Sequence, residues 1–484
     1  MRLTLGWVTQ AVGGDVVASD ADREVGDIVI DSRVVQPGDL FVALRGPRFD
    51  GHDFVGEVLK NGAVAAVVER ADLKVGLYET GAVTRDEPNG TSRRGGPSGP
   101  PALIEVDDTL QALQDMARAV RIESRTRVIA ITGSAGKTTT KETIAEFLGG
   151  RFRVVKNKGN LNNHIGLPLS LLQLRAEPDV AVMELGMNHA GEISALVAIA
   201  EPDVRVWTNV GDAHLGFFES ADAIADAKAE ILERATEATL LICNADDPRV
   251  MARARRFAGR TLTFGTAAAA TVRALNVEDR GLDGMRARVM TPAGERVIET
   301  PLLGRGNLSN VLAATAVAVD GGVPLADIAA AAARLRPADR RGAILRLRNS
   351  ITVIDDSYNS SPAALKRALE VVAHERRSGR KVAVLGEMLE LGEHATALHR
   401  ESGRAAAAAG LDLLVAVGGP PARELADAAV HAGIPAGAVS YFEQSGEAAA
   451  AVAQTVQPGD LVLVKGSRGT RTDVVVDRLV AELA

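Results

Sequence analysis

Residues 127–139 read RVIAITGSAGKTT, and this stretch decides how the surrounding chain folds. The apolar residues 127–132 are typical of a buried strand, and residues 141–148 have a helical pattern. The glycines between them allow the tight turn that brings backbone N–H groups and the positive end of a helix to a polyphosphate. The order of strand, glycine loop and helix therefore predicts a phosphate-binding loop for a nucleoside triphosphate.

The loop is a shortened variant of the usual motif. Only Ser134 and Ala135 separate its first glycine from the Gly-Lys pair, and the usual first glycine position holds Ile131. Lys137 supplies a point charge to the phosphates, and Thr138 offers a hydroxyl to magnesium. The alternative interpretation is a glycine turn that only joins a strand to a helix. The predicted nucleotide-binding residues of the loop are Gly133, Ser134, Ala135, Gly136, Lys137, Thr138 and Thr139.

The bulk properties limit the classes of function. The chain has 484 residues, a length that suits about three domains. Its formal charge of −7 includes no basic block, which argues against nucleic acid or an anionic membrane as a partner. The single cysteine, Cys243, excludes an internal disulfide and a thiolate metal cluster. Because the start lacks a signal sequence and no apolar stretch has membrane-spanning length, we expect a cytoplasmic protein without membrane insertion.

Three α/β domains are predicted. Residues 1–101 form a small N-terminal α/β domain whose last part, 84–101, is so rich in Pro, Gly, Ser and charge that we expect a mobile loop or linker. Residues 102–342 form a central domain with a mostly parallel sheet and the phosphate loop, and residues 343–484 form a Rossmann-like doubly wound domain. The expected strands are 127–132, 180–184, 204–208, 239–243, 351–354, 381–385, 413–417 and 461–464.

Polar residues follow several of these strands directly. In open α/β sheets ligands bind at the carboxyl ends of the strands, so Glu184 and His214 are candidate magnesium ligands beside the triphosphate. A helix-capping carboxylate and a structural histidine are the alternatives. In the last domain, Asp356 suits a ribose hydroxyl pair, and a loop that begins at Lys465 suits a substrate carboxylate or phosphate, unless that lysine is a solvated charge. The amide-rich loop 156–168 is expected to recognise a polar ligand.

Taken together, these segments resemble the Mur ligase family, the ATP-dependent amide-forming enzymes of bacterial cell-wall precursor synthesis. The resemblance covers nearly the whole chain. It is carried by the phosphate loop and by LGEMLELG at 385–392, IDDSYN at 354–359, NLNNHIG at 160–166, DSR at 31–33 and DGH at 50–52.

The resemblance implies roles for individual residues. Lys137 would contact the terminal phosphates of ATP, and Thr138, Glu184 and His214 would hold Mg²⁺ together with Lys228, which the family carries as a carbamylated lysine. Lys228 would otherwise be read as an ordinary helix-surface lysine. The implied catalytic residues are thus Lys137, Glu184, His214 and Lys228. Adenosine or phosphate contacts are implied for Asn307, Asp356 and Arg341, and contacts with the UDP-sugar for Ser32, Arg33, Asn162 and Asn163.

The implied reaction adds D-alanyl-D-alanine to UDP-N-acetylmuramoyl-tripeptide through an acyl phosphate, in a protein expected to be a monomer. The first domain would bind the UDP-sugar, the central domain ATP, and the last domain the incoming dipeptide. Two alternatives stay open: a related ligase with another acceptor, such as a folate-polyglutamate or cyanophycin-type enzyme, and a nucleotide-dependent switch that forms no bond.

Overall fold

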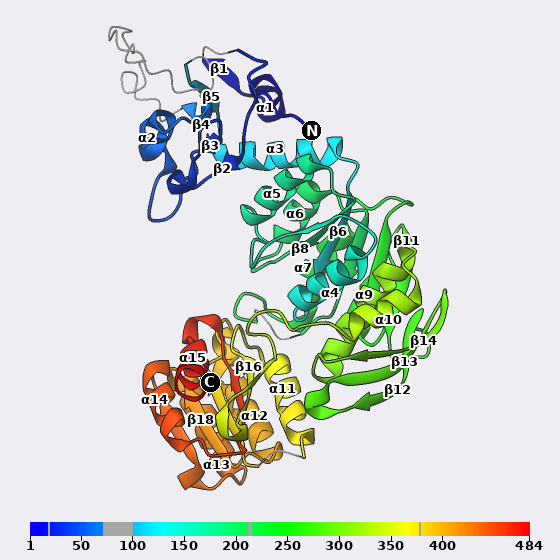
Figure 1. The fold of residues 1–484 in the computed structure, drawn as a ribbon, viewed down its shortest axis with the longest axis vertical. Coiled ribbons are helices and arrows are strands. Elements are labelled where there is room, and N and C mark those ends of the chain that lie inside the picture. Colours follow the sequence, from blue (N-terminus) through cyan, green and yellow to red (C-terminus); the bar gives the residue numbers. More distant parts are fainter. Residues whose placement is uncertain (18–19, 71–99, 212–214, 377–378) are drawn as a thin grey trace. The chain divides into compact units, whose positions relative to one another are not determined.

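The computed structural model describes residues 1–17, 20–70, 100–211, 215–376 and 379–484 (Figure 1). Most of the predicted loop 84–101, and His214, lie outside the described residues. The chain divides into two compact units: the first comprises residues 1–128, 155–183 and 195–201, and the second comprises residues 129–154, 184–194 and 202–484. Among the described residues, no helix combines the length and the apolarity needed to cross a bilayer.

The first sheet has five strands in the order β1-β5-β4-β3-β2, with β1 antiparallel to β5 and the other neighbours parallel. Apolar side chains of β3 and β4, such as Phe41 and Ala66, form a core with Val58 of helix α2. β5 follows the predicted boundary at residue 101 and belongs to this first sheet. The elements are α1 (Leu5–Val12), β1 (Asp15–Val17), β2 (Ile28–Val29), β3 (Leu40–Val42), α2 (Val55–Lys60), β4 (Ala65–Glu69) and β5 (Ala102–Val106).

The second sheet has nine strands in the order β14-β13-β12-β11-β10-β9-β6-β8-β7. β6, β9 and β10 are parallel to one another, as the buried apolar runs predicted, and β11 continues the series in parallel with β10. Its strands are β6 (Arg127–Thr132), β7 (Val154–Lys156), β8 (Val180–Glu184), β9 (Val204–Trp207), β10 (Leu240–Asn244), β11 (Arg260–Gly265), β12 (Val272–Asp279), β13 (Met285–Thr291) and β14 (Gly294–Thr300).

Two features of this sheet differ from the sequence-based expectation. The segment 272–300 continues the sheet as an antiparallel meander, β12 to β14, where alternating strands and helices were expected. Helix α4 begins at Lys137 and not at residue 141. Three successive threonines have weak helix propensity, but Thr140 and Thr143 are buried in the packed face of α4, so tertiary packing outweighs propensity.

The helices between these strands complete the αβ pattern. Helix α9 runs from a glycine-rich start at Gly304 to Asp320. The helices are α3 (Thr109–Glu123), α4 (Lys137–Gly149), α5 (Gly166–Leu171), α6 (Glu192–Ala200), α7 (Ala221–Ala229), α8 (Pro248–Ala254), α9 (Gly304–Asp320) and α10 (Leu325–Ala332).

The third sheet has the order β15-β16-β20-β17-β18-β19, and every pair is parallel except β15 with β16. One core contains Leu369 of α11 and Leu425 of α13, and the other contains Val452 of α14 and Leu479 of α15, so helices cover both faces. This confirms the α/β class and the doubly wound arrangement. The elements are β15 (Ala343–Arg346), β16 (Thr352–Asp356), α11 (Pro362–His374), β17 (Lys381–Gly386), α12 (Ala395–Ala408), β18 (Leu413–Val417), α13 (Pro420–His431), β19 (Val439–Phe442), α14 (Ser445–Thr455), β20 (Leu461–Lys465) and α15 (Asp473–Leu483).

Candidate active site

The phosphate loop adopts a backbone that requires glycine at two positions. Gly133 has φ = +148° and Gly136 has φ = +83°, a region in which other residues are strained. A side chain at Gly133 would also collide with the Thr208 hydroxyl, and one at Gly136 would collide with the carboxamide of Asn310. The loop is therefore shaped both by its own glycines and by the close approach of β9 and α9.

The carboxyl ends of β6 and β8 bring a hydroxyl and a carboxylate together. Thr138, in the first turn of α4, donates a hydrogen bond from Oγ1 to Glu184 Oε2 at 2.7 Å. Glu184 ends β8 and is only 4% exposed. Because β9, β6 and β8 are neighbours in the sheet, the phosphate loop, Glu184 and the described residues 208–211 lie at one edge.

Lys137 lies at the start of the same helix. Its ammonium donates to the carbonyl of Gly133 at 2.8 Å, so the side chain folds back over the loop that it follows. Burial lowers the pKa of Lys137 from its ordinary value; Glu184 opposes this shift, and Arg341 adds to it. The structure thus brings Glu184 and Arg341 within electrostatic reach of Lys137.

The residues present fit a magnesium ion. The Thr138 hydroxyl and the Glu184 carboxylate are hard oxygen donors at hydrogen-bonding distance from each other, the donor type that Mg²⁺ prefers, and phosphate oxygens would complete the shell. Within the described part of the chain, no three His, Cys, Asp or Glu residues gather as a metal site.

Lys228 is buried in α7 and is 1% exposed, so it is not the surface lysine that its sequence context suggested. Burial shifts the pKa of Lys228 well below its ordinary value, the charge of Lys137 lowers it further, and Glu230 opposes the shift. Glu230 itself accepts the backbone N–H groups of Gly191 and Ser194 at 2.6 and 3.0 Å, which ties the end of α7 to the segment after β8.

The residues that the sequence predicted to contact adenosine and phosphate each interact with another residue of the protein. Asn307 Nδ2 donates to the carbonyl of Leu303 at 2.9 Å at the start of α9. The guanidinium of Arg341 lies over the ring of Tyr358, 4.1 Å from its centroid. Asp356 accepts a hydrogen bond from Lys465 Nζ at 2.6 Å, and Lys465 is 3% exposed. Lys465 is therefore a buried ion-pair partner and not a solvated loop charge.

The predicted UDP-sugar residues lie in the first unit. Asp31 binds the guanidinium of Arg33 through two contacts of 2.8 and 2.6 Å, and these hydrogen bonds lower the pKa of Asp31 to about 2. Ser32 and Arg33 belong to a short 3₁₀ helix that Asp31 caps. Asn163 uses its side-chain oxygen to accept the N–H groups of residues 165 and 166 at the start of α5. Asn162 donates its backbone N–H to the carbonyl of Asn160 at 2.8 Å.

Comparison with known proteins identifies the family. Residues 131–318 match the Mur ligase middle domain, residues 340–468 match the Mur ligase glutamate ligase domain, and residues 24–121 match the catalytic domain of the Mur ligase family. The chain belongs to the Mur ligase family. It is a ligase, as the resemblance implied.

Relatives of this Mur ligase extend over nearly its whole length. The UDP-N-acetylmuramoyl-tripeptide–D-alanyl-D-alanine ligase of Bacillus subtilis is 33% identical over 94% of this chain and 93% of its own, and that of Escherichia coli is 35% identical over 86% of each. A crystal structure of MurF from Acinetobacter baumannii superposes with a TM-score of 0.84 at 32% identity over 99% of each chain. MurF from Thermotoga maritima in complex with ADP superposes with a TM-score of 0.77 at 30% identity over 94% of this chain and 97% of its own.

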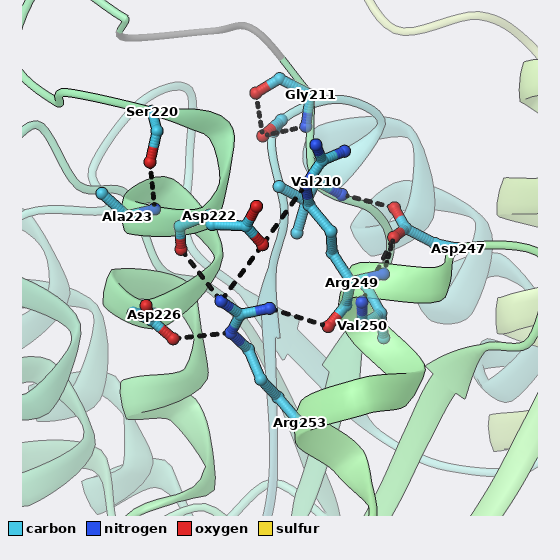
Figure 2. Close-up of polar contacts among 11 residues, drawn as sticks. Val210, Gly211, Ser220, Asp222, Ala223, Asp226, Asp247, Arg249, Val250 and Arg253 are labelled. Atoms are coloured by element: carbon cyan, nitrogen blue, oxygen red, sulfur yellow. Dashed lines mark hydrogen bonds and ion pairs between the residues drawn. The ribbon is translucent and has the colours of Figure 1, made fainter.

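Ion pairs connect α7, the helix that carries Lys228, to α8, and a hydrogen bond connects the start of α8 to the segment that follows β9 (Figure 2). Arg253 of α8 contacts Asp226 at 2.7 Å and Asp222 at 3.4 Å, both on α7. Asp247 caps the start of α8 and also accepts the backbone N–H of Val210 at 2.8 Å. Sequence analysis predicted no role for these residues, because each contact joins two elements that are distant in the chain and leaves no local pattern.

Proposed function

We propose that this Mur ligase joins D-alanyl-D-alanine to UDP-N-acetylmuramoyl-tripeptide and converts ATP to ADP and phosphate. The observation that carries the proposal is the phosphate loop at the carboxyl edge of a parallel sheet, with Lys137 over the loop and the Thr138–Glu184 pair beside it. It is supported by relatives of that name at 33–35% identity across most of the chain, and by the structural relative solved with ADP.

The reaction requires activation of a carboxylate, which is a poor electrophile. An oxygen of the terminal carboxylate of the tripeptide attacks the γ-phosphorus of ATP, the bond to the β-phosphate oxygen breaks, and ADP leaves. The neutral amine of the dipeptide then attacks the carbonyl carbon of the acyl phosphate. The carbon–oxygen bond to phosphate breaks, the amine nitrogen loses a proton, and the products are an amide and inorganic phosphate. Little covalent chemistry by the protein is required.

The protein's part is alignment and charge neutralisation. Lys137 and Arg341 place positive charge at the transferring phosphoryl group, where charge accumulates in the transition state. Thr138 and Glu184, together with His214, are proposed to hold Mg²⁺. When bound, the ion supplies charge neutralisation at the β- and γ-phosphate oxygens.

Lys228 is proposed to be carbamylated and to contribute to the same magnesium site. Carbamylation requires a neutral amine, and the burial of Lys228 lowers its pKa well below the ordinary value. The product is an anion, which a buried site accepts only beside positive charge, and Lys137 supplies such charge here. The pKa shift and the location of the amine both favour the modified form.

The remaining roles follow the domain assignment. Asn307 and Asp356 are proposed to contact adenosine, and the last domain is proposed to bind the dipeptide. The protein is proposed to act as a cytoplasmic monomer, which size-exclusion chromatography with light scattering would test. The proposed UDP-sugar contacts are Ser32, Arg33, Asn162 and Asn163.

The test is substrate-dependent ADP release. ADP should form only when the UDP-linked tripeptide, D-alanyl-D-alanine and magnesium are all present, and product mass with a lysine or a diaminopimelate tripeptide identifies the third residue. Lys137→Ala should abolish this release, whereas Lys366→Ala, at an exposed position on α11, should not change it. Steady hydrolysis without either substrate would favour a nucleotide switch, and turnover with another acceptor would favour a different ligase.

A further inference from the structure

Ala135 lies in the middle of the shortened phosphate loop. Its backbone N–H and its carbonyl both form hydrogen bonds with one neighbouring segment. Asn209 accepts the Ala135 N–H through Oδ1 at 3.0 Å and donates from Nδ2 to the Ala135 carbonyl at 2.9 Å. The hydroxyl of Thr208 donates to the same carbonyl at 2.8 Å. A single carboxamide thus satisfies both backbone groups of one loop residue, as a neighbouring strand would.

The contact extends to the preceding loop residue, Ser134. Ser134 donates its N–H to the carbonyl of Asn209 at 3.0 Å. Its hydroxyl donates to the Gly211 carbonyl at 3.2 Å and accepts the Gly211 N–H at 2.9 Å. Residues 208–211 therefore contact two consecutive loop residues through backbone and side chains, and the methyl side chain of Ala135 can form no hydrogen bond of its own.

Residues 208–211 are in turn held from behind. Asn244, at the end of β10 and 8% exposed, donates from Nδ2 to the carbonyl of Thr208 at 2.9 Å. Asp247 accepts the N–H of Val210, and Figure 2 shows this contact beside the α7–α8 ion pairs. Hydrogen bonds to β10 and to the start of α8 therefore fix residues 208–211 independently of the phosphate loop.

We infer that Asn209, assisted by Thr208, is a positioning residue that presets the phosphate loop for ATP. The inference rests on the proposed function, because it concerns how the same nucleotide is bound. Helix α4 begins after Gly136, which has no side chain to cap the N–H groups of the first turn. Fixing both peptide planes at Ala135 orients Gly136 and the first N–H groups of α4, which are the groups that a helix start offers to phosphate.

A second consequence concerns which N–H groups bind the nucleotide. The Ala135 N–H is already committed to Asn209, so it is not available to a phosphate oxygen. The phosphate-binding groups therefore begin at Gly136. This compensates for the shortened loop: fewer loop residues encircle the phosphates, and β9 supplies the rigidity that a longer loop would provide from its own backbone.

The experiment compares variants that change these hydrogen bonds with little change in volume. Asn209→Asp keeps the acceptor for the Ala135 N–H but places a carboxylate oxygen against the Ala135 carbonyl. Thr208→Val removes the hydroxyl, and Thr208→Ser keeps it. The matched control is Thr315→Val, because Thr315 is fully buried on α9 and its hydroxyl donates only to its own helix, at Val311. The readouts are the KM for each of the three substrates, the Kd for ADP from calorimetry, and the urea unfolding midpoint.

Asn209→Asp should raise the KM for ATP and the Kd for ADP about tenfold or more, with the KM for the other two substrates unchanged. Thr208→Val should raise both nucleotide constants about threefold to tenfold, Thr208→Ser should stay within about twofold of the parent, and Thr315→Val should not change them. If Asn209→Asp does not fold, the comparison of Thr208→Val with Thr208→Ser tests the inference.

Two results would overturn the inference. One is ADP binding within about twofold of the parent in both Asn209→Asp and Thr208→Val. The other is an equal rise in all three KM values together with a lower unfolding midpoint, which would indicate a purely structural role. A parent protein that binds no ADP and forms no amide contradicts the proposed function instead, so the two failures are distinguishable.

Discussion

The Thr138 hydroxyl donates to the Glu184 carboxylate at 2.7 Å, and this bond joins the first turn of α4 to the end of β8. The two residues are 46 positions apart in the chain. They meet because β6 and β8 are sheet neighbours whose carboxyl ends share one edge. The bond places a hydroxyl and a carboxylate at one point beside the phosphate loop, where the proposed magnesium ion would need oxygen ligands.

Replacement of either member of this pair should reduce magnesium-dependent turnover. Glu184→Gln removes a negative charge from the metal site, so we expect kcat to fall by about 10²-fold or more and the magnesium concentration for half-maximal activity to rise. Thr138→Val should act in the same direction, and Thr138→Ser should retain most of the activity. Magnesium titrations of ADP release measure both quantities. Unchanged magnesium dependence in Glu184→Gln would contradict the assignment.

Activity should depend on dissolved carbon dioxide if Lys228 is carbamylated. Lys228→Met keeps a buried side chain of similar length but cannot be carbamylated, so we expect turnover to fall at least about 10²-fold. The parent protein should lose activity after removal of carbon dioxide and regain it with added bicarbonate. Lys228→Met should respond to neither treatment. A parent whose ADP release is the same with and without bicarbonate would argue for an unmodified lysine.

Loss of Asp356 and loss of Lys465, which form a buried ion pair in the last domain, should lower the free energy of unfolding by unequal amounts. Asp356→Asn leaves the ammonium of Lys465 buried without its carboxylate, and we expect a loss of about 3 kcal/mol in the free energy of unfolding. Lys465→Met removes the buried charge, and the partly exposed Asp356 can be hydrated, so the loss should be smaller. Urea unfolding without nucleotide measures both changes. Equal losses would show that the unpaired buried charge of Lys465 is not the main cause of the destabilisation.

Stacking of Arg341 on Tyr358 should matter for nucleotide use. The guanidinium lies 4.1 Å from the ring centroid, and Arg468 approaches the same ring at 5.5 Å. Loss of one such contact costs about 0.5–2 kcal/mol. Tyr358→Leu should therefore reduce kcat/KM for ATP by roughly threefold to thirtyfold, and Tyr358→Phe should restore most of it because the ring remains. Initial-rate measurements at varied ATP compare the two. Equal effects would point to the phenol hydroxyl instead.

Acid should weaken the last domain through His399. This side chain is fully buried, and its Nε2 accepts the N–H of Met388 at 2.9 Å, within the segment LGEMLELG. Burial lowers its pKa below the ordinary 6.5, although a hydrogen bond to the carbonyl of Ala395 and the charge of Glu387 oppose this. Below about pH 6.5 the unfolded chain binds more protons than the folded one, so the free energy of unfolding should decrease as pH falls through that value.

His399→Gln should flatten this dependence, because glutamine accepts the same N–H without titrating. Urea unfolding at pH 7.5 and pH 5.5 should show a larger loss of stability for the parent than for the variant. Identical pH dependence in the two proteins would show that other groups control acid stability.

Local sequence patterns accounted for much of the fold. The continuous apolar runs at Val180–Glu184 and Leu413–Val417 are the strands that were predicted, because a strand buried on both faces must be apolar along its length. The phosphate loop was likewise predicted, since glycine and the strand-loop-helix order are local signals. The start of α4 was missed, because its threonines are stabilised by packing that no local pattern records.

The sequence by itself determined the chemistry that is available: a phosphate loop, a carboxylate after one strand, and polar segments after others. Tertiary structure alone decided which of these side chains meet. The contacts of Asn209 with Ala135 and of Lys465 with Asp356 span 74 and 109 positions, and they exist only because the strand order places their elements side by side. Burial, which turns Lys228 into a low-pKa amine, is likewise a property of the packed sheet and helices and not of the residues around it in the chain.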